Sequence, residues 1–469
     1  MQSASKLLAT LSALALSACA VGPDYAQPTP RPASTGPFLS ANDPAFSPAE
    51  LPEDWWRLYD DPVLDSLVRD ALAANTDVRQ SLARIERARA GLRGARGDRL
   101  PQTGIGADAA YGRLPESQVL PGMDREGWSY DLGMDVGYEV DLFGRVSRGI
   151  EAARADLAAS EAEADAVRVI VAAETTRAYA DAASTASRLS VAREIVRLLD
   201  QSLALTSRRF EAGLENGLAV SRIATLRNQR AAEIPALEAE RAAALFRLAT
   251  LTGRPPAELP PIAGERSLVL EIEQPLPVGD GTALLARRPD IRFAERRLAA
   301  DTAQIGIATA DLYPRIALGG SVGSTGADIG DIFTGGPFRW LLGPLLSWSF
   351  PNQEPIRARI EAAEADVQGS LAAFDEAVLR ALEETETALS NYSRTLERRR
   401  ALQSASEEAE RAVRIVRAQQ REGTINSLDR LDAERTLAEA RAELANQDAE
   451  VSRAQIDVFR ALGGGWTAG

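Results

Sequence analysis

The sequence predicts a mainly α-helical chain that carries a small transmembrane β part and contains two structural repeats. Three observations predict this fold class. Residues 128–142 alternate strictly between large apolar and small or charged side chains, a period that only an extended strand resolves into two faces. Residues 145–211 are rich in Ala, Arg, Glu and Leu and contain no proline, which is typical of a long helix. Short motifs of the first half return at a nearly fixed spacing in the second half.

Residues 1–18 have the features of a lipoprotein signal peptide. The apolar run from Leu7 to Leu16 is too short to span a bilayer as a helix. It ends in Leu16-Ser17-Ala18-Cys19, which resembles a lipobox whose cysteine carries the lipid. Cys19 is the only cysteine of the chain, and Ala20 after it favours sorting to the outer membrane. Lipid on Cys19 would anchor the chain without spanning the membrane.

The segment after the signal peptide changes from irregular to helical. Residues 19–62 are rich in proline and lack periodicity, which predicts an extended arm on the outside of the body. From Val63 the pattern is helical to about Arg99, where Leu100-Pro101 ends it.

Two strands follow and form a predicted β-hairpin over residues 102–142. The first covers residues 102–111, and a polar loop joins it to the long strand 128–142. Fifteen residues at ~3.3 Å each reach about 50 Å, whereas a transmembrane strand needs only ~9–11 residues. Aromatic residues near its ends match the interfacial girdles of outer-membrane barrels. A soluble sheet avoids such a long apolar edge, so we expect this strand to cross a membrane.

A long helical hairpin completes the first repeat, which covers residues 63–255. The 67 residues from 145 to 211 would form a helix about 100 Å long. Gly213 and Gly217 interrupt the pattern, and a second helical stretch returns to Gly253.

The second repeat covers residues 256–466. It predicts another helix, a β-hairpin at 315–350 and a second long helical hairpin, and Gly463-Gly464-Gly465 predicts a helix stop. The matching positions are Asp77-Val78-Arg79 with Asp290-Ile291-Arg292 and Pro101 with Pro314, at an offset of 213, and Gly213 with Gly423 and Gly253 with Gly463, at an offset of 210.

Composition argues against several classes of function. The chain has no histidine, which removes most hydrolytic triads and histidine metal sites. Its net charge of −14 argues against a nucleic-acid partner. Paired carboxylates such as Glu383-Glu384 lie in charged helical segments, and the glycine-rich pieces lack the lysine of a phosphate loop. We therefore expect no enzymatic activity, no metal and no cofactor.

Four strands per chain require an oligomer. About eight strands are the fewest that close a membrane barrel, and open strand edges are not tolerated in lipid. Two copies would give eight strands and a filled lumen, and three would give twelve strands and a channel. Strand number alone leaves both open.

Motifs spread over the mature chain resemble those of TolC-like outer membrane factors, in the lipoprotein branch that includes NodT-type and RND-linked efflux proteins. The resemblance implies a homotrimer with a twelve-stranded barrel in the outer membrane. It also implies a helical tube in the periplasm that docks an adaptor (membrane fusion) protein and an inner-membrane efflux pump. The motifs are Cys19-Ala20-Val21-Gly22-Pro23-Asp24-Tyr25, Val140-Asp141-Leu142-Phe143-Gly144, Ala286-Arg287-Arg288-Pro289-Asp290-Ile291, Leu342-Gly343-Pro344-Leu345-Leu346-Ser347-Trp348 and Ala461-Leu462-Gly463-Gly464-Gly465-Trp466.

The turn of the second helical hairpin is the candidate pore constriction. By resemblance, Leu428, Asp429 and Asp432 line it. Asp429 and Asp432 are three residues apart and share a helical face, and Asp432 and Arg435 have the spacing of a salt bridge. Three copies would place six carboxylates in one ring that attracts cations. A helix N-terminus that favours aspartate through its dipole is the alternative explanation.

Both hairpin tips are candidate adaptor contacts. They comprise Gly213, Leu214 and Gly217 in the first repeat, and Gly423 and Thr424 in the second.

The predicted function is a passive, lipid-anchored exit duct for small-molecule export across the outer membrane, driven by an inner-membrane partner. A type I secretion-style duct for polypeptides is one alternative. A coiled-coil lipoprotein that scaffolds the envelope is another, although it does not explain the strand 128–142.

Overall fold

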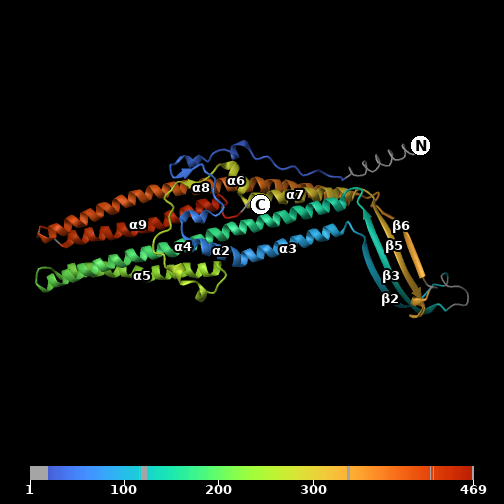
Figure 1. Cartoon of the computed structure of the whole chain (residues 1–469), viewed down its shortest axis with the longest axis horizontal. Coiled ribbons are helices and arrows are strands. Elements are labelled where there is room, and N and C mark those ends of the chain that lie inside the picture. Colours follow the sequence, from blue (N-terminus) through green and yellow to red (C-terminus); the bar gives the residue numbers. More distant parts are fainter. Residues whose placement is uncertain are drawn as a thin grey trace. The chain divides into compact units, whose positions relative to one another are not determined.

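The structure is a computed structural model of the 469-residue chain. It describes residues 20–115, 117, 124–334, 338–422, 424–425 and 427–466, except for the side chains of residues 421, 427 and 428. The described chain is mainly helical with one four-stranded sheet (Figure 1).

The chain divides into two compact units, which we name the sheet unit and the helical unit. Each takes residues from both predicted repeats, so the repeats are not themselves the compact units. The sheet unit comprises Met1–Pro28 (described from residue 20), Arg84–Glu161 and Phe293–Asp375, and the helical unit comprises Thr29–Ala83, Ala162–Arg292 and Glu376–Gly469 (described to residue 466).

Four antiparallel strands form the sheet in the order β2 (Gln102–Arg113), β3 (Glu126–Val140), β5 (Arg315–Gly326) and β6 (Phe338–Ser347). Figure 1 shows them side by side. A short helix, η7 (Asp331–Phe333), lies between β5 and β6 in the chain. The strand predicted to end at residue 142 ends at Val140, because the Asp141 carboxylate accepts the backbone N–H groups of Val146 and Ser147 at 2.9 and 2.8 Å. The last strand ends at Ser347 rather than at residue 350.

The register gives the sheet two different faces. The apolar face carries large exposed side chains, among them Trp340 and Leu342, which are 72% and 74% exposed. The polar face carries Asp131 and Arg339, whose side chains pair at 2.7 Å, together with Leu341 and Leu345 of β6. Its central positions also include seven glycines, at 104, 106, 133, 137, 319, 323 and 343.

The sheet unit also contains helices that begin or end next to the strands. These are most of α3 (Thr76–Gly97), most of α7 (Pro289–Ala310), and the first parts of α4 (Arg145–Glu211) and α8 (Glu354–Arg421). Leu92 of α3 packs against Val146 and Ile150 of α4. Small residues of α4 and α7 (Ala155, Ala299) also lie together, which allows close approach of the two helices.

The helix predicted over residues 63–99 is interrupted, which corrects the sequence analysis. It consists of α2 (Pro62–Ala74) and α3, separated by Asn75 with an extended ψ of 138°. The Asn75 side chain accepts the backbone N–H of Asp77 at 2.8 Å and donates to the carbonyl of Leu251 at 3.0 Å. The break therefore combines a local helix cap with a contact to a distant segment.

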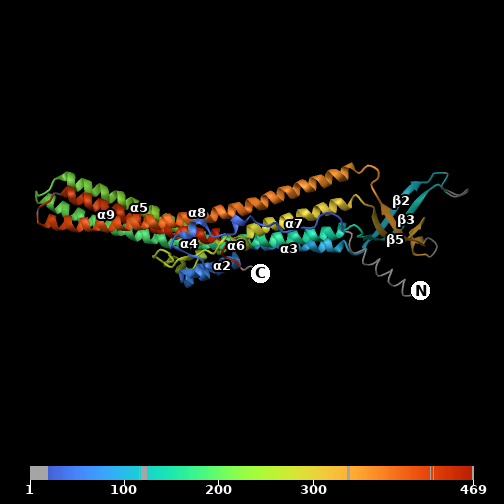
Figure 2. The same ribbon diagram turned by 90° about the horizontal axis from the view of Figure 1, so that it is seen from above.

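The helical unit contains the remaining parts of α4 and α8 with their returning helices. Figures 1 and 2 show α5 (Gly217–Leu251) along α4 and α9 (Ser427–Ala461) along α8. The returning helices have 35 residues, against 67 in α4 and 68 in α8. Only α4 and α8 therefore reach about 100 Å.

Two segments are more structured, or structured differently, than predicted. The arm contains the short helices η1 (Pro32–Ser34), η2 (Leu39–Asn42) and η3 (Trp55–Tyr59), and strand β1 (Phe46–Ser47), which pairs in parallel with β4 (Leu276–Pro277). The second repeat was predicted to begin with a helix near residue 256, but α7 begins only at Pro289. Prolines at 255, 256, 260 and 261 oppose an α-helix there. The segment instead forms η5 (Pro256–Glu258), η6 (Pro261–Gly264), β4 and α6 (Gly281–Arg287).

An aromatic cluster forms part of the core of the helical unit. Trp55 is fully buried and stacks on Phe459 of α9, with ring centroids 4.6 Å apart. A Cβ at Gly464 would lie 2.6 Å from Cδ1 of Trp55. The glycine run after α9 thus makes room for this ring, as well as ending the helix with Gly463 at φ 71°.

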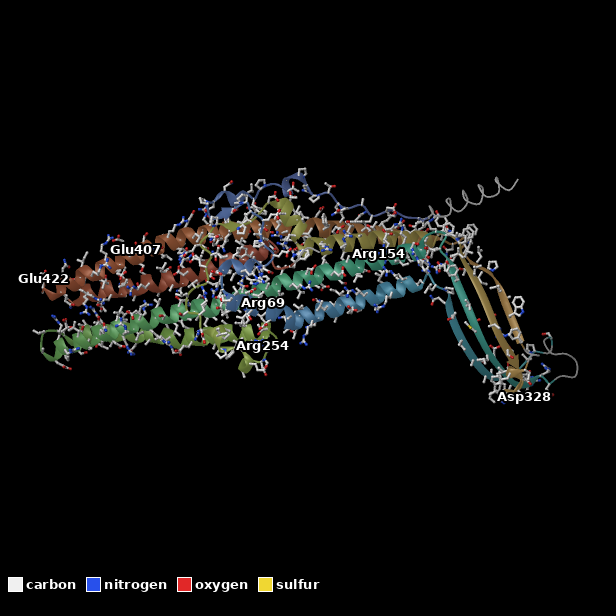
Figure 3. The ribbon with its side chains drawn as sticks, in the orientation of Figure 1. Arg69, Arg154, Arg254, Asp328, Glu407 and Glu422 are labelled. Carbon is white, nitrogen blue, oxygen red and sulfur yellow. The ribbon has the colours of Figure 1, made fainter. Side chains whose placement is uncertain are left out.

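Charged side chains cover the helices. Arg69, Arg154 and Glu407 project from α2, α4 and α8 (Figure 3). Within the part of the chain that the structure describes, no helix combines the length and apolar character needed to cross a membrane.

Candidate functional site

The first turns of α9 carry the residues predicted to form the constriction. Asp429, Asp432 and Arg435 line one groove between α9 and α5, with a volume of about 720 Å³. The guanidinium of Arg435 donates to the Asp432 carboxylate at 2.8 Å, as the spacing of these residues suggested. Leu428 lies in the first turn of α9, but its side chain is outside the described residues.

A second arginine that the sequence analysis missed lines the same groove. Arg222 of α5 lies there with Leu218, Ser221 and Thr225. The groove thus brings two carboxylates and two guanidinium groups together. The signal that could have found Arg222 is the repeat itself, because the offset of 210 aligns Arg222 with Asp432.

Buried charges join the first turns of α9 to two other helices. Arg430 and Glu434 are 8% and 6% exposed. The Glu434 carboxylate accepts from Oγ of Ser202 in α4 at 2.8 Å and from Nε of Arg430 at 3.0 Å, and Arg417 of α8 lies 3.3 Å away. Arg430 also donates to the side chains of Ser202 and Gln420, at 2.5 and 2.8 Å. Buried charges are tolerated only with such partners, so this cluster ties α9 to α4 and α8.

The described part of the second tip closes the end of α8. The backbone N–H and the hydroxyl of Thr424 both donate to the carbonyl of Gln419, at 3.1 and 3.0 Å. Gly423 lies outside the described residues.

The first tip is a compact turn with apolar side chains on its surface. Gly213 has φ 70°, and the N–H of Leu214 donates to the carbonyl of Arg209 at 2.8 Å, which is a common way for a helix to end. Asn216 caps α5, whose first residue is Gly217, by accepting the N–H of Ala219 at 3.0 Å. Leu214 is 68% exposed, so this tip presents apolar surface.

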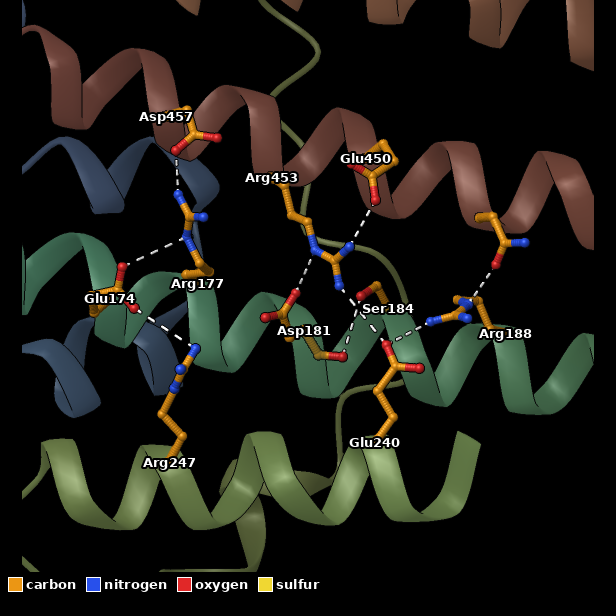
Figure 4. Close-up of polar contacts among 11 residues, drawn as sticks. Glu174, Arg177, Asp181, Ser184, Arg188, Glu240, Arg247, Glu450, Arg453 and Asp457 are labelled. Atoms are coloured by element: carbon orange, nitrogen blue, oxygen red, sulfur yellow. Dashed lines mark hydrogen bonds and ion pairs between the residues drawn. The ribbon is translucent and has the colours of Figure 1, made fainter. Parts of the chain in front are cut away.

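Ion pairs connect α4 to α5 and α9 further along the helical unit. In Figure 4, Arg453 of α9 pairs with Asp181 of α4 at 2.8 Å, and Arg188 of α4 pairs with Glu240 of α5 at 2.8 Å. Arg177 of α4 pairs with Asp457 of α9. The two pairs with α9 link a helix of the first repeat to one of the second repeat, whereas the Arg188–Glu240 pair joins two helices of the first repeat.

Aromatic side chains lie at two levels of the sheet. Near one end, Trp128 contacts Tyr111 and Tyr130, with ring centroids 5.6 and 5.8 Å apart. Tyr138 lies ten residues after Trp128 on the same face of β3, which corresponds to ~33 Å along a strand. A strand tilt of ~40° reduces this to about 25 Å across the membrane, the height of the apolar band of outer-membrane barrels.

Comparison with known proteins decides the family. The family model described as outer membrane efflux protein matches residues 67–254 and 282–464. The chain belongs to the outer membrane efflux protein family. The two matched segments fall within the two predicted repeats.

The relatives match over nearly their whole length. Outer membrane protein OprJ of Pseudomonas aeruginosa is 33% identical over 465 residues, covering 98% of this chain and 96% of that protein. Solvent efflux pump outer membrane protein SrpC of Pseudomonas putida is 30% identical over 468 residues, with 98% of each chain covered. Nodulation protein T of Rhizobium leguminosarum bv. trifolii is 30% identical over 460 residues, covering 97% of this chain and 96% of that protein.

Solved channel structures share the fold. The outer-membrane channel OprN superposes with a TM-score of 0.88 at 36% identity, covering 96% of this chain and all of that one. The open state of the Neisseria gonorrhoeae MtrE outer membrane channel gives a TM-score of 0.82 at 28% identity, covering 95% and 98%. These findings confirm the predicted TolC-like fold and the predicted function as an efflux protein of the outer membrane.

Proposed function

We propose that this chain is the exit duct of a tripartite, RND-type efflux system: a passive homotrimer that exports small molecules and catalyses no reaction. The open sheet with one apolar face carries this proposal. Among the described residues, no other strand pairs with the outer edge of β2 or of β6. Unpaired backbone groups are not tolerated in lipid, so β6 of one copy would pair with β2 of the next.

Three copies suit the polar face better than two. Eight strands enclose an interior that side chains fill, whereas a larger barrel leaves a channel. Asp131, Arg339 and the glycines of the polar face are suited to a water-filled interior rather than to a packed one. This supports twelve strands around one duct.

The partners in this proposal are an adaptor protein and an inner-membrane pump. The exposed Leu214 and Leu218 of the first tip would contact the adaptor, together with Gly213, Gly217, Gly423 and Thr424. The description of SrpC as the outer membrane protein of a solvent efflux pump supports a pump partner. Cys19, which lies outside the described residues, would carry the lipid anchor.

The oligomeric mass of the extracted protein and its ability to restore efflux to a deficient host together test the proposed duct. Protein extracted from the outer membrane in detergent is expected to have the mass of three chains. Expressed with its adaptor and pump, it should restore drug resistance to a host that lacks its own efflux channel. A monomer recovered outside the outer membrane would overturn the proposal.

We also propose that Leu428, Asp429, Asp432 and Arg435 narrow the periplasmic end of the duct. The groove that holds Asp429 and Asp432 also holds two arginines, so the field there should be weaker than two carboxylates alone would produce.

Single-channel recording tests this constriction. Asp429→Ala with Asp432→Ala should raise the conductance and abolish block by multivalent cations, whereas Arg435→Gln should increase the preference for cations. Glu238→Ala, an exposed carboxylate on α5 that pairs with Arg193, serves as a control and should change neither. Unchanged conductance and block in the double variant would place the constriction elsewhere.

A further inference from the structure

A short stretch of the arm, residues 20–25, lies against α4 and α7 within the sheet unit. The N–H of Val21 donates to the carbonyl of Phe143 at 3.2 Å. Tyr25 packs on a cluster that contains Ala155 of α4 and Ala299 of α7. Five extended residue steps cover ~17 Å, which equals the ~17 Å between residues 144 and 155 along the start of α4. The stretch therefore follows the helices in an extended form.

Arg148 of α4 holds the backbone of this stretch. Its side chain is only 6% exposed. The guanidinium donates to the carbonyls of Val21 and Gly22 at 3.3 and 3.4 Å, and to the Asp24 carboxylate at 2.7 Å. It also pairs with Glu151 at 2.8 Å. A buried guanidinium needs acceptors for its N–H groups, and here the arm supplies most of them.

Glycines make the close approach possible. Gly22 has φ +91°, and a Cβ there would lie 2.5 Å from Cα of Gly306 in α7. Gly144 has φ +80°, and a Cβ there would lie 2.8 Å from Cα of Ala20. Larger residues would push the arm away at both points.

A second buried charge fixes the far end of the stretch. Glu295 of α7 is 4% exposed, and it accepts a hydrogen bond from the Tyr25 hydroxyl. Its other oxygen accepts from Arg296 at 2.7 Å. The Tyr25 hydroxyl thus supplies the hydrogen bond to one oxygen of this buried carboxylate, and Arg296 supplies the bond to the other.

We propose that α4 and α7 form a docking site for the chain's own residues 20–25, built around Arg148, Glu295 and Gly306. This site holds the start of the mature chain beside the junction of β3 and α4 without help from a lipid. It is a second attachment, independent of the one proposed at Cys19.

The consequence concerns how the arm stays in place. A second attachment beside a lipid anchor raises the effective concentration of both attachments. This consequence depends on the proposed lipid at Cys19, whereas the docking site itself does not.

Hydrogen exchange of the peptide that covers residues 20–26 tests the docking site. In full-length Cys19→Ser protein, which carries no lipid, this peptide should exchange slowly. Adding Gly22→Ala should speed its exchange at least tenfold, and Arg148→Gln should act in the same direction. Gly36→Ala is the matched control, because Gly36 also lies in the arm but has open space where a Cβ would be; it should have no effect.

Two results would overturn the proposal. One is fast exchange in the Cys19→Ser protein itself, and the other is slow exchange that survives Gly22→Ala. If Cys19→Ser protein does not accumulate, the two glycine variants are compared in the lipidated protein instead. Faster exchange in Gly22→Ala than in Gly36→Ala would support the docking site, and equal exchange would overturn it. The measurement uses extracted protein and no transport, so a failed rescue assay would count against the proposed function alone.

Discussion

At the scale of single residues, Asp61 shows how one buried carboxylate joins distant segments. Its side chain is 5% exposed. One oxygen accepts the N–H groups of Val63 and Leu64 at 2.9 and 3.2 Å, which caps α2. The other accepts from the Tyr179 hydroxyl at 2.9 Å and from Arg266 at 2.8 Å. Hydrogen bonds to an ionised group are worth about 1.5–3 kcal/mol each, so this residue stabilises three segments at once.

Tyr179→Phe should change both the stability and its pH dependence. Burial, together with the Asp61 carboxylate, raises the pKa of Tyr179 above its ordinary value. The unfolded chain therefore releases this proton at lower pH than the folded protein, and stability falls as the pH rises above about 10. We expect the variant to lose about 1.5 kcal/mol at pH 7 and to show a shallower loss of stability from pH 9 to 11. Parallel curves for the two proteins would contradict this.

Local patterns predict only part of such a residue's role. An aspartate directly before a helix that begins with proline is a recognisable cap. Tyr179 and Arg266, however, lie 118 and 205 residues away, and no spacing rule connects them to Asp61. The same holds for Arg148, which meets the arm 124 residues earlier in the chain.

At the scale of elements, helix boundaries follow the sequence where the signal is local. The predicted helix over residues 145–211 is α4 with the same bounds, because Asp141 caps its start and Gly213 follows its end. The break at Asn75 combines a local cap, in which its side chain accepts the N–H of Asp77, with a bond to the distant Leu251 that no local pattern shows. In helix α9, the spacing of Arg430 and Glu434 predicts an ion pair. The sequence does not show that this pair is buried, because the burial comes from contacts with other helices.

Glu434→Ala should destabilise the tip of the second hairpin. It would leave the buried Arg430 without its carboxylate, which costs about 3–5 kcal/mol. Replacing both residues, Arg430→Leu with Glu434→Leu, should cost much less, because no buried charge remains unpaired. Glu439 lies on the same helix as Glu434, and its exposed carboxylate is 3.4 Å from Arg230 of α5; Glu439→Ala should change stability by less than about 1 kcal/mol.

Thermal unfolding in detergent and hydrogen exchange over residues 429–440 measure these effects. If the single variant is no less stable than the double variant, the buried pair is not what ties α9 to its neighbours.

At the scale of the whole molecule, the strand pattern predicts the sheet and its need for partners. Alternation in β3 and β6 identifies which side chains share a face, and the number of strands follows from the repeat. The order β2-β3-β5-β6 was not predictable from these patterns. The pairing of β3 with β5 joins residues 176 to 196 positions apart, and only the folded chain brings them together.

Arginine substitutions on the two faces of β6 should show which face meets lipid and which faces the interior of the barrel. Leu342 lies on the apolar face and Leu341 on the polar face, and both are exposed in the single chain. Leu342→Arg would place a charge in lipid, at a cost of up to about 2–4 kcal/mol per chain. We expect it to abolish trimers in the outer membrane, whereas Leu341→Arg should assemble. Equal yields of the two variants would mean that the apolar face does not meet lipid.

The glycines of the polar face have a further consequence for transport. In the proposed trimer, Gly104, Gly133 and Gly319 would belong to the bore, together with the other glycines of that face. A wall without side chains offers a passing molecule few groups to adhere to. Residence times inside the barrel should therefore be short and depend little on the chemistry of the cargo. Release into the medium would then keep pace with whatever the pump delivers.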